Sequence, residues 1–146
     1  MYEKLFLALI DSSSAHAEAS RKIFSTLALS EGQPKILYIL RRQDGLMQKN
    51  LAALCGIRES TLTTLLSKLD EKGLVRRERK LTTTGKSSFA VFLTEEGRKI
   101  AERLEQEVER LEECSFRGFS REERETLLSM LSRITHNLRE NETQTR

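Results

Sequence analysis

The sequence predicts a mainly α-helical protein with one β-hairpin, and three observations indicate this fold class. Apolar residues recur three and four positions apart along most of the 146 residues, which is the spacing of amphipathic helices. The chain contains one proline and seven glycines, so few residues interrupt those helices. Apolar side chains alternate as in a strand at Ser88–Leu93. With 38% hydrophobic and 32% charged residues, the composition is that of a globular protein rather than a disordered one.

The length of the chain suits a single domain that needs no disulfides or metals for its stability. Two cysteines, Cys55 and Cys114, are too few for a disulfide framework, which favours a reducing compartment. There is no apolar run of about 18 residues, and the first residues lack the pattern of a signal peptide. We therefore expect a cytoplasmic protein that does not associate with membranes.

A long amphipathic helix is expected from Tyr2 to Leu29. Its apolar positions fall into two groups with helical spacing, namely Leu5, Phe6, Leu9 and Ile10, then Ile23, Phe24 and Leu27. Seven small residues would let another helix approach closely, namely Ser12, Ser13, Ser14, Ala15, Ala17, Ala19 and Ser20. The helix could therefore belong to a subunit interface, line a ligand cavity, or simply pack on the chain's own core.

A second helix is predicted to begin near Ser30. Ser30 and Gln33 match a capping box, in which each side chain accepts a hydrogen bond from the backbone N–H of the other residue. Pro34 is tolerated in the first turn of such a helix. Its buried face would consist of Ile36, Leu37, Ile39 and Leu40.

Two short helices joined by a tight turn are predicted next, within residues 46–77. The inner stripe of the first is formed by Met47, Leu51, Leu54 and Cys55. Gly56 ends that helix, and Ile57 supplies an apolar side chain in the turn. The second helix runs from about Glu59 to Lys72, before Gly73. This layout is typical of a helix-turn-helix motif.

The second helix of the motif has one apolar side and one small, polar side. Its inward residues are Leu62, Leu65, Leu66 and Leu69, and its outward residues include Ser60, Thr61, Thr63, Thr64, Ser67 and Lys68. A surface of such small side chains can enter a DNA major groove, which is about 12 Å wide. An ordinary surface helix would more often carry Glu and Lys pairs there.

A basic hairpin follows this helix. Its first strand begins at Leu74 and Val75, and its tip carries Gly85 and Lys86. Residues 58–99 contain ten Lys or Arg against six Asp or Glu, whereas residues 100–146 contain eight against eleven. The hairpin is therefore predicted to be a wing that reaches a minor groove or the phosphates beside it. On charge alone, a merely solvated hairpin is an equal alternative.

Two further helices are predicted after the hairpin. Thr94 caps the first, and Ser120 caps the second with Glu123 three residues later. Their apolar stripes are Ile100, Leu104, Val108 and Leu111, then Leu127, Leu131, Ile134 and Leu138. These stripes require partners, either within the chain or in a second copy. We assign residues 1–30 and 95–146 to a dimerisation bundle and residues 31–94 to DNA binding, within one intertwined domain.

The sequence resembles the MarR family of winged helix-turn-helix regulators over nearly its whole length. The matching positions are Gln48, Leu51–Ala52, Gly56–Ile57, Ser60–Thr63, Leu69, Lys72–Arg77 and Leu93–Gly97. The resemblance implies a homodimer that binds double-stranded DNA at a pseudo-palindromic operator and represses transcription. It also implies release by a small anionic or phenolic effector, or by an oxidant. An effector would bind where the first, second and fifth helices meet.

The residues predicted to contact DNA are Arg58, Ser60, Thr61, Thr63, Thr64, Lys68, Arg76, Arg77, Arg79 and Lys86. Thr64 and Lys68 stand where the family often has arginine, so the bidentate guanine contact that arginine makes is absent there. Lys86 alone represents the family's basic wing tip, and Arg58 replaces the usual helix cap. We therefore predict modest sequence discrimination and an affinity that falls as salt rises.

Other functions find less support in the sequence. His16 and His136 are far apart, and no catalytic, cofactor or zinc motif is present, so we expect no enzyme activity, cofactor or metal. A winged-helix module that binds a protein instead of DNA would leave the basic hairpin without a purpose. A thiol-based redox sensor of the same fold is a further alternative, although Cys55 occupies an inward position and Cys114 follows two glutamates, which disfavour a thiolate.

Overall fold

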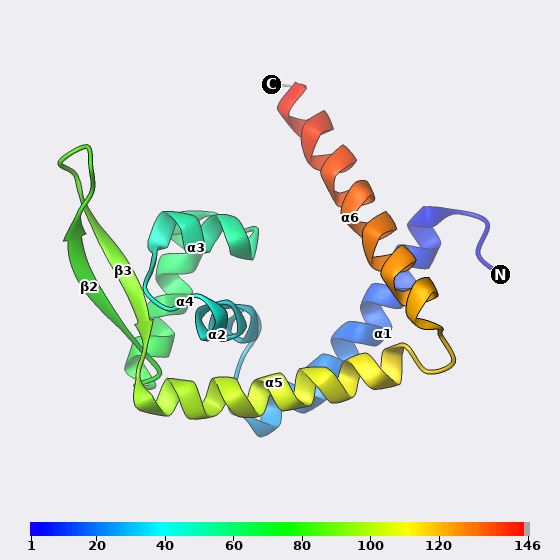
Figure 1. Cartoon of the computed structure of the whole chain (residues 1–146), viewed down its shortest axis with the longest axis horizontal. Coiled ribbons are helices and arrows are strands. Elements are labelled where there is room, and N and C mark those ends of the chain that lie inside the picture. The colour runs from blue at the N-terminus through cyan, green and yellow to red at the C-terminus, as the bar shows by residue number, and fades with distance from the viewer. Residues whose placement is uncertain (145–146) are drawn as a thin grey trace. The chain divides into compact units, whose positions relative to one another are not determined.

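The computed structural model describes residues 1–144, which form six helices and a three-stranded sheet (Figure 1). The helices are α1 Leu5–Thr26, α2 Gln33–Arg42, α3 Gln48–Cys55, α4 Glu59–Glu71, α5 Glu95–Ser115 and α6 Arg121–Gln144, and the strands are β1 Leu46–Met47, β2 Val75–Leu81 and β3 Ser87–Leu93. The predicted fold class, mainly helical with a hairpin wing, is confirmed. The last two residues of the predicted dimerisation range 95–146 lie outside the described residues.

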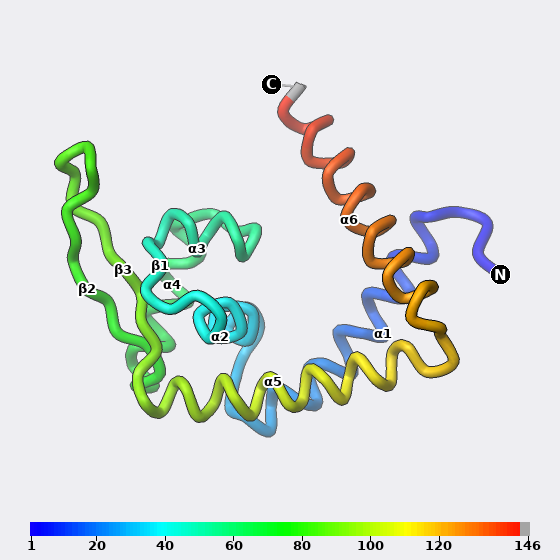
Figure 2. The backbone as a smooth tube through the Cα atoms, in the orientation of Figure 1, coloured from blue at the N-terminus to red at the C-terminus, as the bar shows by residue number. Residues whose placement is uncertain are grey.

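The chain forms two compact units, residues 1–111 and residues 112–146. In the first unit, α2, α3, α4, the sheet and the start of α5 surround the hydrophobic core. Its largest fully buried apolar side chains are Ile36, Leu37, Leu40, Leu51, Leu62, Leu66, Leu69, Val75, Val91 and Leu104. Each such side chain contributes about 1.5–3 kcal/mol through removal of its surface from water. In Figure 2 the backbone of α2 lies close to the α3–α4 motif and, in this view, above α5.

Helix α4 has the orientation that its sequence predicts. Leu62, Leu66 and Leu69 are fully buried, and Leu65 is partly buried against the same core. In α3, Leu51 and Cys55 are buried as expected, but the prediction for Leu54 is wrong because its side chain is 51% exposed. The buried face of this eight-residue helix is formed by Leu51, Ala52 and Cys55 instead, and Leu54 lies outside that face.

The sheet contains a strand that the sequence did not indicate. β1 pairs antiparallel with β3, so that β3 lies between β1 and β2. A strand of two residues, Leu46 and Met47, is too short to show alternation. The central position of β3 also explains why Ala90 is buried next to Val91, although strict alternation would expose one of the two.

Helix α2 begins at Gln33 rather than near Ser30. Gly32 holds the N-cap position with a φ of 86°, and half of the predicted capping box forms, because the Ser30 N–H donates to Gln33 Oε1 at 3.1 Å. The end of α4 is joined to this loop. Lys72 Nζ donates to the carbonyl oxygen of Ala28 at 2.7 Å and to Gln33 Oε1 at 2.9 Å.

The starts of α5 and α6 are capped as predicted. The Gly97 N–H donates to Thr94 Oγ1 at 3.0 Å, and the Thr94 hydroxyl donates to the Gly73 carbonyl at 2.6 Å. In the second unit, Ser120 and Glu123 form a complete capping box with bonds of 3.1 and 2.7 Å. These local patterns depend on residues three positions apart, which is why the sequence alone could predict them.

Candidate nucleic-acid interface

The outward surface of α4 is polar and free of the chain's own core. Ser60, Thr61, Thr63, Thr64 and Lys68 are all exposed, while the leucines on the other side hold the helix in place. This is the arrangement that a recognition helix requires, because the exposed side must fit within a major groove.

Two threonine hydroxyls of α4, those of Thr63 and Thr64, are already used as donors within the helix. Thr63 donates to the Glu59 carbonyl at 2.9 Å, and Thr64 donates to the Ser60 carbonyl at 3.3 Å. Thr63 Oγ1 also accepts a hydrogen bond from Gln48 Nε2 at 3.5 Å. Each hydroxyl oxygen still has a lone pair that can accept a hydrogen bond from the amino group of adenine or cytosine, and the methyl groups can contact thymine. Ser60 and Thr61 make no side-chain hydrogen bond within residues 1–144, so their hydroxyls can donate or accept.

Arg58 occupies the N-cap position of α4 without capping it. The Arg58 side chain makes no capping hydrogen bond, so the positive end of the helix can meet an anion. The exposed Arg58 adds a full positive charge at the same end. Together they form a suitable partner for a DNA phosphate.

We expect Arg58→Ser to change stability and DNA affinity in opposite directions. A serine cap should stabilise the fold by about 1 kcal/mol, which raises the melting temperature by roughly 2–4 °C in a chain of this size. Loss of the cation should weaken DNA binding by roughly fivefold at low salt. Arg58→Met is the matched control, because it removes the charge without adding a cap. Tighter DNA binding by Arg58→Ser would contradict a phosphate-binding role.

We call β2, β3 and the turn between them the wing. Lys86 is exposed to solvent at its tip. The turn is closed by hydrogen bonds from the Thr82 N–H to the Lys86 carbonyl at 2.8 Å and from the Gly85 N–H to the Thr82 carbonyl at 2.9 Å. Gly85 has a φ of 77°, which a residue with a side chain rarely adopts. The hairpin extends well beyond the core in Figure 1.

The predicted DNA-binding cations of the wing have different surroundings. Arg76 pairs with Glu78, and Arg77 is 25% exposed and lies 3.6 Å from Asp70 of α4. These two guanidinium groups therefore have partners within the chain. Arg79 and Lys86, like Arg58 and Lys68 near α4, are exposed and form no ion pair within the described residues.

Two phenylalanines support the wing cations, and sequence reasoning missed them. The Arg76 guanidinium lies 4.5 Å from the centre of the Phe92 ring, and that of Arg79 lies 5.5 Å from the Phe89 ring. Each arginine is paired with its phenylalanine across β2 and β3. These arginine–phenylalanine pairs could have been predicted from the register of the two strands, which can be counted outward from the turn at Gly85.

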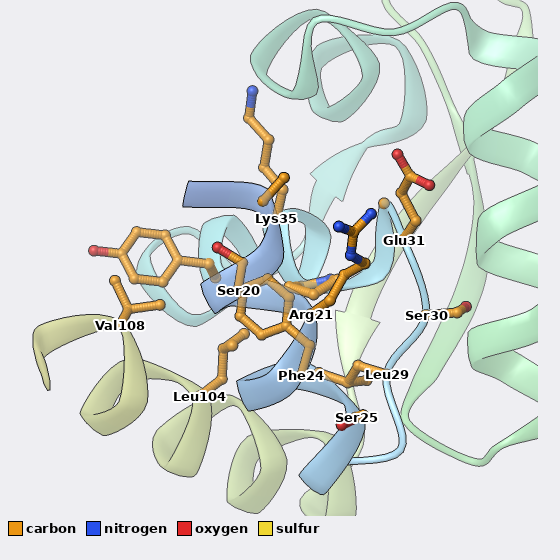
Figure 3. A pocket seen from close by; sticks show the side chains of 14 residues that line it. Ser20, Arg21, Phe24, Ser25, Leu29, Ser30, Glu31, Lys35, Leu104 and Val108 are labelled. Carbon is orange, nitrogen blue, oxygen red and sulfur yellow. The ribbon is translucent and has the colours of Figure 1, made fainter. Parts of the chain in front are cut away.

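A pocket of about 640 Å³ lies between α1, the α1–α2 loop, α2 and α5 (Figure 3). It occupies the place where an effector cleft was expected, but the sequence did not identify its lining. Phe24 and Tyr38 contribute aromatic rings, Arg21 and Lys35 contribute positive charges, and Glu31 contributes one negative charge. Such a lining suits a small molecule with an apolar body and an anionic group.

An ionic contact also joins α2 and α5. Arg41 Nε lies 2.6 Å from Glu105 Oε2, and Arg42 Nη2 lies 2.9 Å from Glu105 Oε1. The hydrogen bond from Arg41 lowers the pKa of the Glu105 carboxyl, so this residue stays ionised. The Arg42 guanidinium also covers the Tyr38 ring at 3.9 Å, which links the contact to the pocket wall.

Comparison with known proteins identifies the family. Residues 29–82 match the sequence model of the MarR family. A MarR-family transcriptional regulator from Silicibacter pomeroyi, whose crystal structure is known, is 30% identical, with 90% of this chain and 87% of that chain aligned at a TM-score of 0.72. The chain belongs to the MarR family.

Two other solved structures are similar to this MarR-family protein. The transcriptional repressor CouR, bound to a 23-mer DNA duplex, is 27% identical, with 91% of this chain and 93% of that chain aligned at a TM-score of 0.78. NadR, in complex with 4-hydroxyphenylacetate, is 26% identical, with the same coverage and a TM-score of 0.75. Membership of the MarR family makes the protein a DNA-binding transcriptional regulator rather than an enzyme.

The cysteines of this MarR-family protein differ in their surroundings. Cys55 is buried and Cys114 is exposed. Burial raises the pKa of the Cys55 thiol, and the opposing charge of Lys35 does not cancel that effect. A protonated thiol is a poor nucleophile, so the surroundings of Cys55 do not favour redox sensing. Within residues 1–144, no cluster of metal-binding side chains is present and no helix is long and apolar enough to cross a membrane.

Proposed function

We propose that the protein is a homodimeric, ligand-responsive repressor. In this proposal, the α4 helices of the two subunits enter successive major grooves of a pseudo-palindromic operator, and the wings contact the DNA beside them. The observation that carries the proposal is the outward surface of α4, which is small and polar and carries Arg58 and Lys68, two exposed cations that form no ion pair within residues 1–144. Because the chain lacks arginine at positions 64 and 68, we expect much of the affinity to be electrostatic.

Exposed apolar side chains on α1 and α6 support the homodimer. On α1 these are Leu5, Phe6, Leu7 and Ile10, and on α6 they are Leu127, Leu128, Met130, Leu131 and Leu138. Apolar groups gathered in this way on a helix face mark a site of association. A second copy of the chain would cover them, and we therefore retain residues 1–30 and 95–144 as the dimerisation helices.

The pocket supports a response to a small aromatic acid. Phe24 and Tyr38 can pack against a ring, and Arg21 and Lys35 can pair with a carboxylate. A volume of about 640 Å³ is sufficient for a molecule with one ring. The complex of NadR with 4-hydroxyphenylacetate makes this acid a reasonable first probe.

DNA binding by this surface should depend steeply on salt. We expect Lys68→Met and Lys86→Met each to weaken binding to a duplex and to reduce the slope of log K against log salt by about 1. Gel-shift titrations between low and physiological salt measure both quantities. Lys22→Met removes an equal charge from α1 and serves as the control. If both variants bind as the control does, the proposed interface is wrong.

A further inference from the structure

Lys35 lies at the boundary between the pocket and the helix-turn-helix. It is part of α2, and its side chain lines the pocket together with Arg21 and Phe24 (Figure 3). Its ammonium group, however, donates to the carbonyl oxygen of Cys55 at 3.1 Å. Cys55 is the last residue of α3, the first helix of the motif. One side chain therefore connects the pocket wall to the DNA-binding motif.

The position of this hydrogen bond makes it significant for α4. The last carbonyl groups of a helix lack partners within the helix, and a cation near them also complements the helix dipole. Gly56 ends α3 with a φ of 69°, and α4 begins at Glu59, so the Cys55 carbonyl lies at the start of the short turn between the helices. Holding this carbonyl helps to fix the turn, and the turn fixes the direction of α4.

We propose that Lys35 couples the pocket to the recognition helix, because a carboxylate in the pocket and the Cys55 carbonyl compete for the same ammonium group. The inference rests on the proposed function, since it concerns regulation by the same pocket. When Lys35 pairs with a carboxylate, the end of α3 loses its cation and the turn at residues 55–58 is less firmly held. DNA affinity then falls. By linkage, bound DNA weakens the binding of the acid by the same factor.

Arg21 offers a matched comparison within the same pocket. It also contributes one positive charge to the lining, but it comes from α1 and forms no hydrogen bond with the helix-turn-helix within residues 1–144. Replacing either residue by methionine removes one charge from the pocket and one from the whole chain. Only the Lys35 substitution removes a bond to α3.

The first test measures DNA affinity without any small molecule. We expect Lys35→Met to bind a duplex about tenfold more weakly than the wild type, because a charge-assisted hydrogen bond to α3 is lost. Arg21→Met should remain within about twofold of the wild type. Lys35→Arg should recover most of the affinity, since a guanidinium can also donate to the Cys55 carbonyl. Hydrogen exchange at residues 55–60 should be faster in Lys35→Met and unchanged in Arg21→Met, and melting temperatures establish that all variants are folded.

The second test adds 4-hydroxyphenylacetate or its uncharged amide to the protein–DNA complex. The acid should release DNA from the wild type more effectively than the amide, and it should have little further effect on Lys35→Met. Equal DNA affinities of Lys35→Met and Arg21→Met would overturn the coupling, whatever the acid does. Equal release of DNA from Lys35→Met and the wild type would also overturn it. If the wild type does not bind a duplex even at low salt, the proposed function fails instead.

Discussion

Replacing Leu131 by glutamate is expected to lower the affinity for a palindromic duplex by about a hundredfold. The reason is that binding to the second half-site raises the overall affinity only when the two subunits are joined. Leu131 lies on α6 and is 37% exposed, within the stripe that includes Leu127 and Leu138. In the proposed homodimer a second chain covers this stripe. A carboxylate buried there would have no partner and would separate the subunits.

The measurement needs a duplex selected by the wild type from a random pool, together with sedimentation of each variant. Ser129→Glu is the control, because it adds the same charge to the same helix on the side away from Leu131. It should leave both the dimer and the DNA affinity unchanged. A Leu131→Glu variant that sediments as the wild type does and binds DNA equally well would exclude this surface of α6 as the interface.

Gly97→Ala is expected to be the most destabilising single substitution at a glycine. A Cβ at this position would lie 1.9 Å from the Leu74 carbonyl oxygen, a backbone atom that cannot rotate away. Leu74 leads into β2, and Gly97 is in the first turn of α5, so the clash would separate the wing from α5. We expect a loss of about 3 kcal/mol or more, which lowers the melting temperature by roughly 6–12 °C.

Thermal unfolding followed by circular dichroism measures this effect. Gln106→Ala, an exposed site on the same helix, is the control and should change the melting temperature little. Elsewhere in a helix, alanine is more favourable than glycine by about 1 kcal/mol, so a stabilised Gly97→Ala protein would show that α5 does not contact Leu74 closely.

The parts of the fold that the sequence predicted are those that depend on near neighbours. The leucine stripe of α4 and the caps at Thr94 and Ser120 follow from spacings of three and four residues. The exposure of Leu54 and the formation of β1 depend instead on how α3 and β3 pack against distant parts of the chain. No local sequence pattern indicates this packing.

The candidate site shows the same division. The exposed residues of α4 and the wing tip at Lys86 could be predicted, since helical periodicity and hairpin chemistry place them. Glu78, the partner of Arg76, lies two residues further along β2, so strand alternation places both on one face and local sequence could predict this pair. The pairing of Arg77 with Asp70 could not be predicted in this way, because it depends on how β2 meets α4. The lining of the pocket comes from segments far apart in the sequence, such as Phe24 and Leu104, which are 80 residues apart, and only the folded chain brings them together.

The contact between α4 and the wing has a consequence for how the protein selects DNA. Arg77 pairs with Asp70, and the Leu74 N–H donates to the Leu69 carbonyl at 2.9 Å, so two contacts link the hairpin to the end of α4. In the proposed complex, α4 lies in the major groove and the wing reaches the DNA phosphates beyond it. The distance between these two contacts is then set by the protein. A duplex whose grooves do not match that distance would have to bend or change its minor-groove width, so we expect base steps that deform at little cost to be favoured even where no side chain touches them.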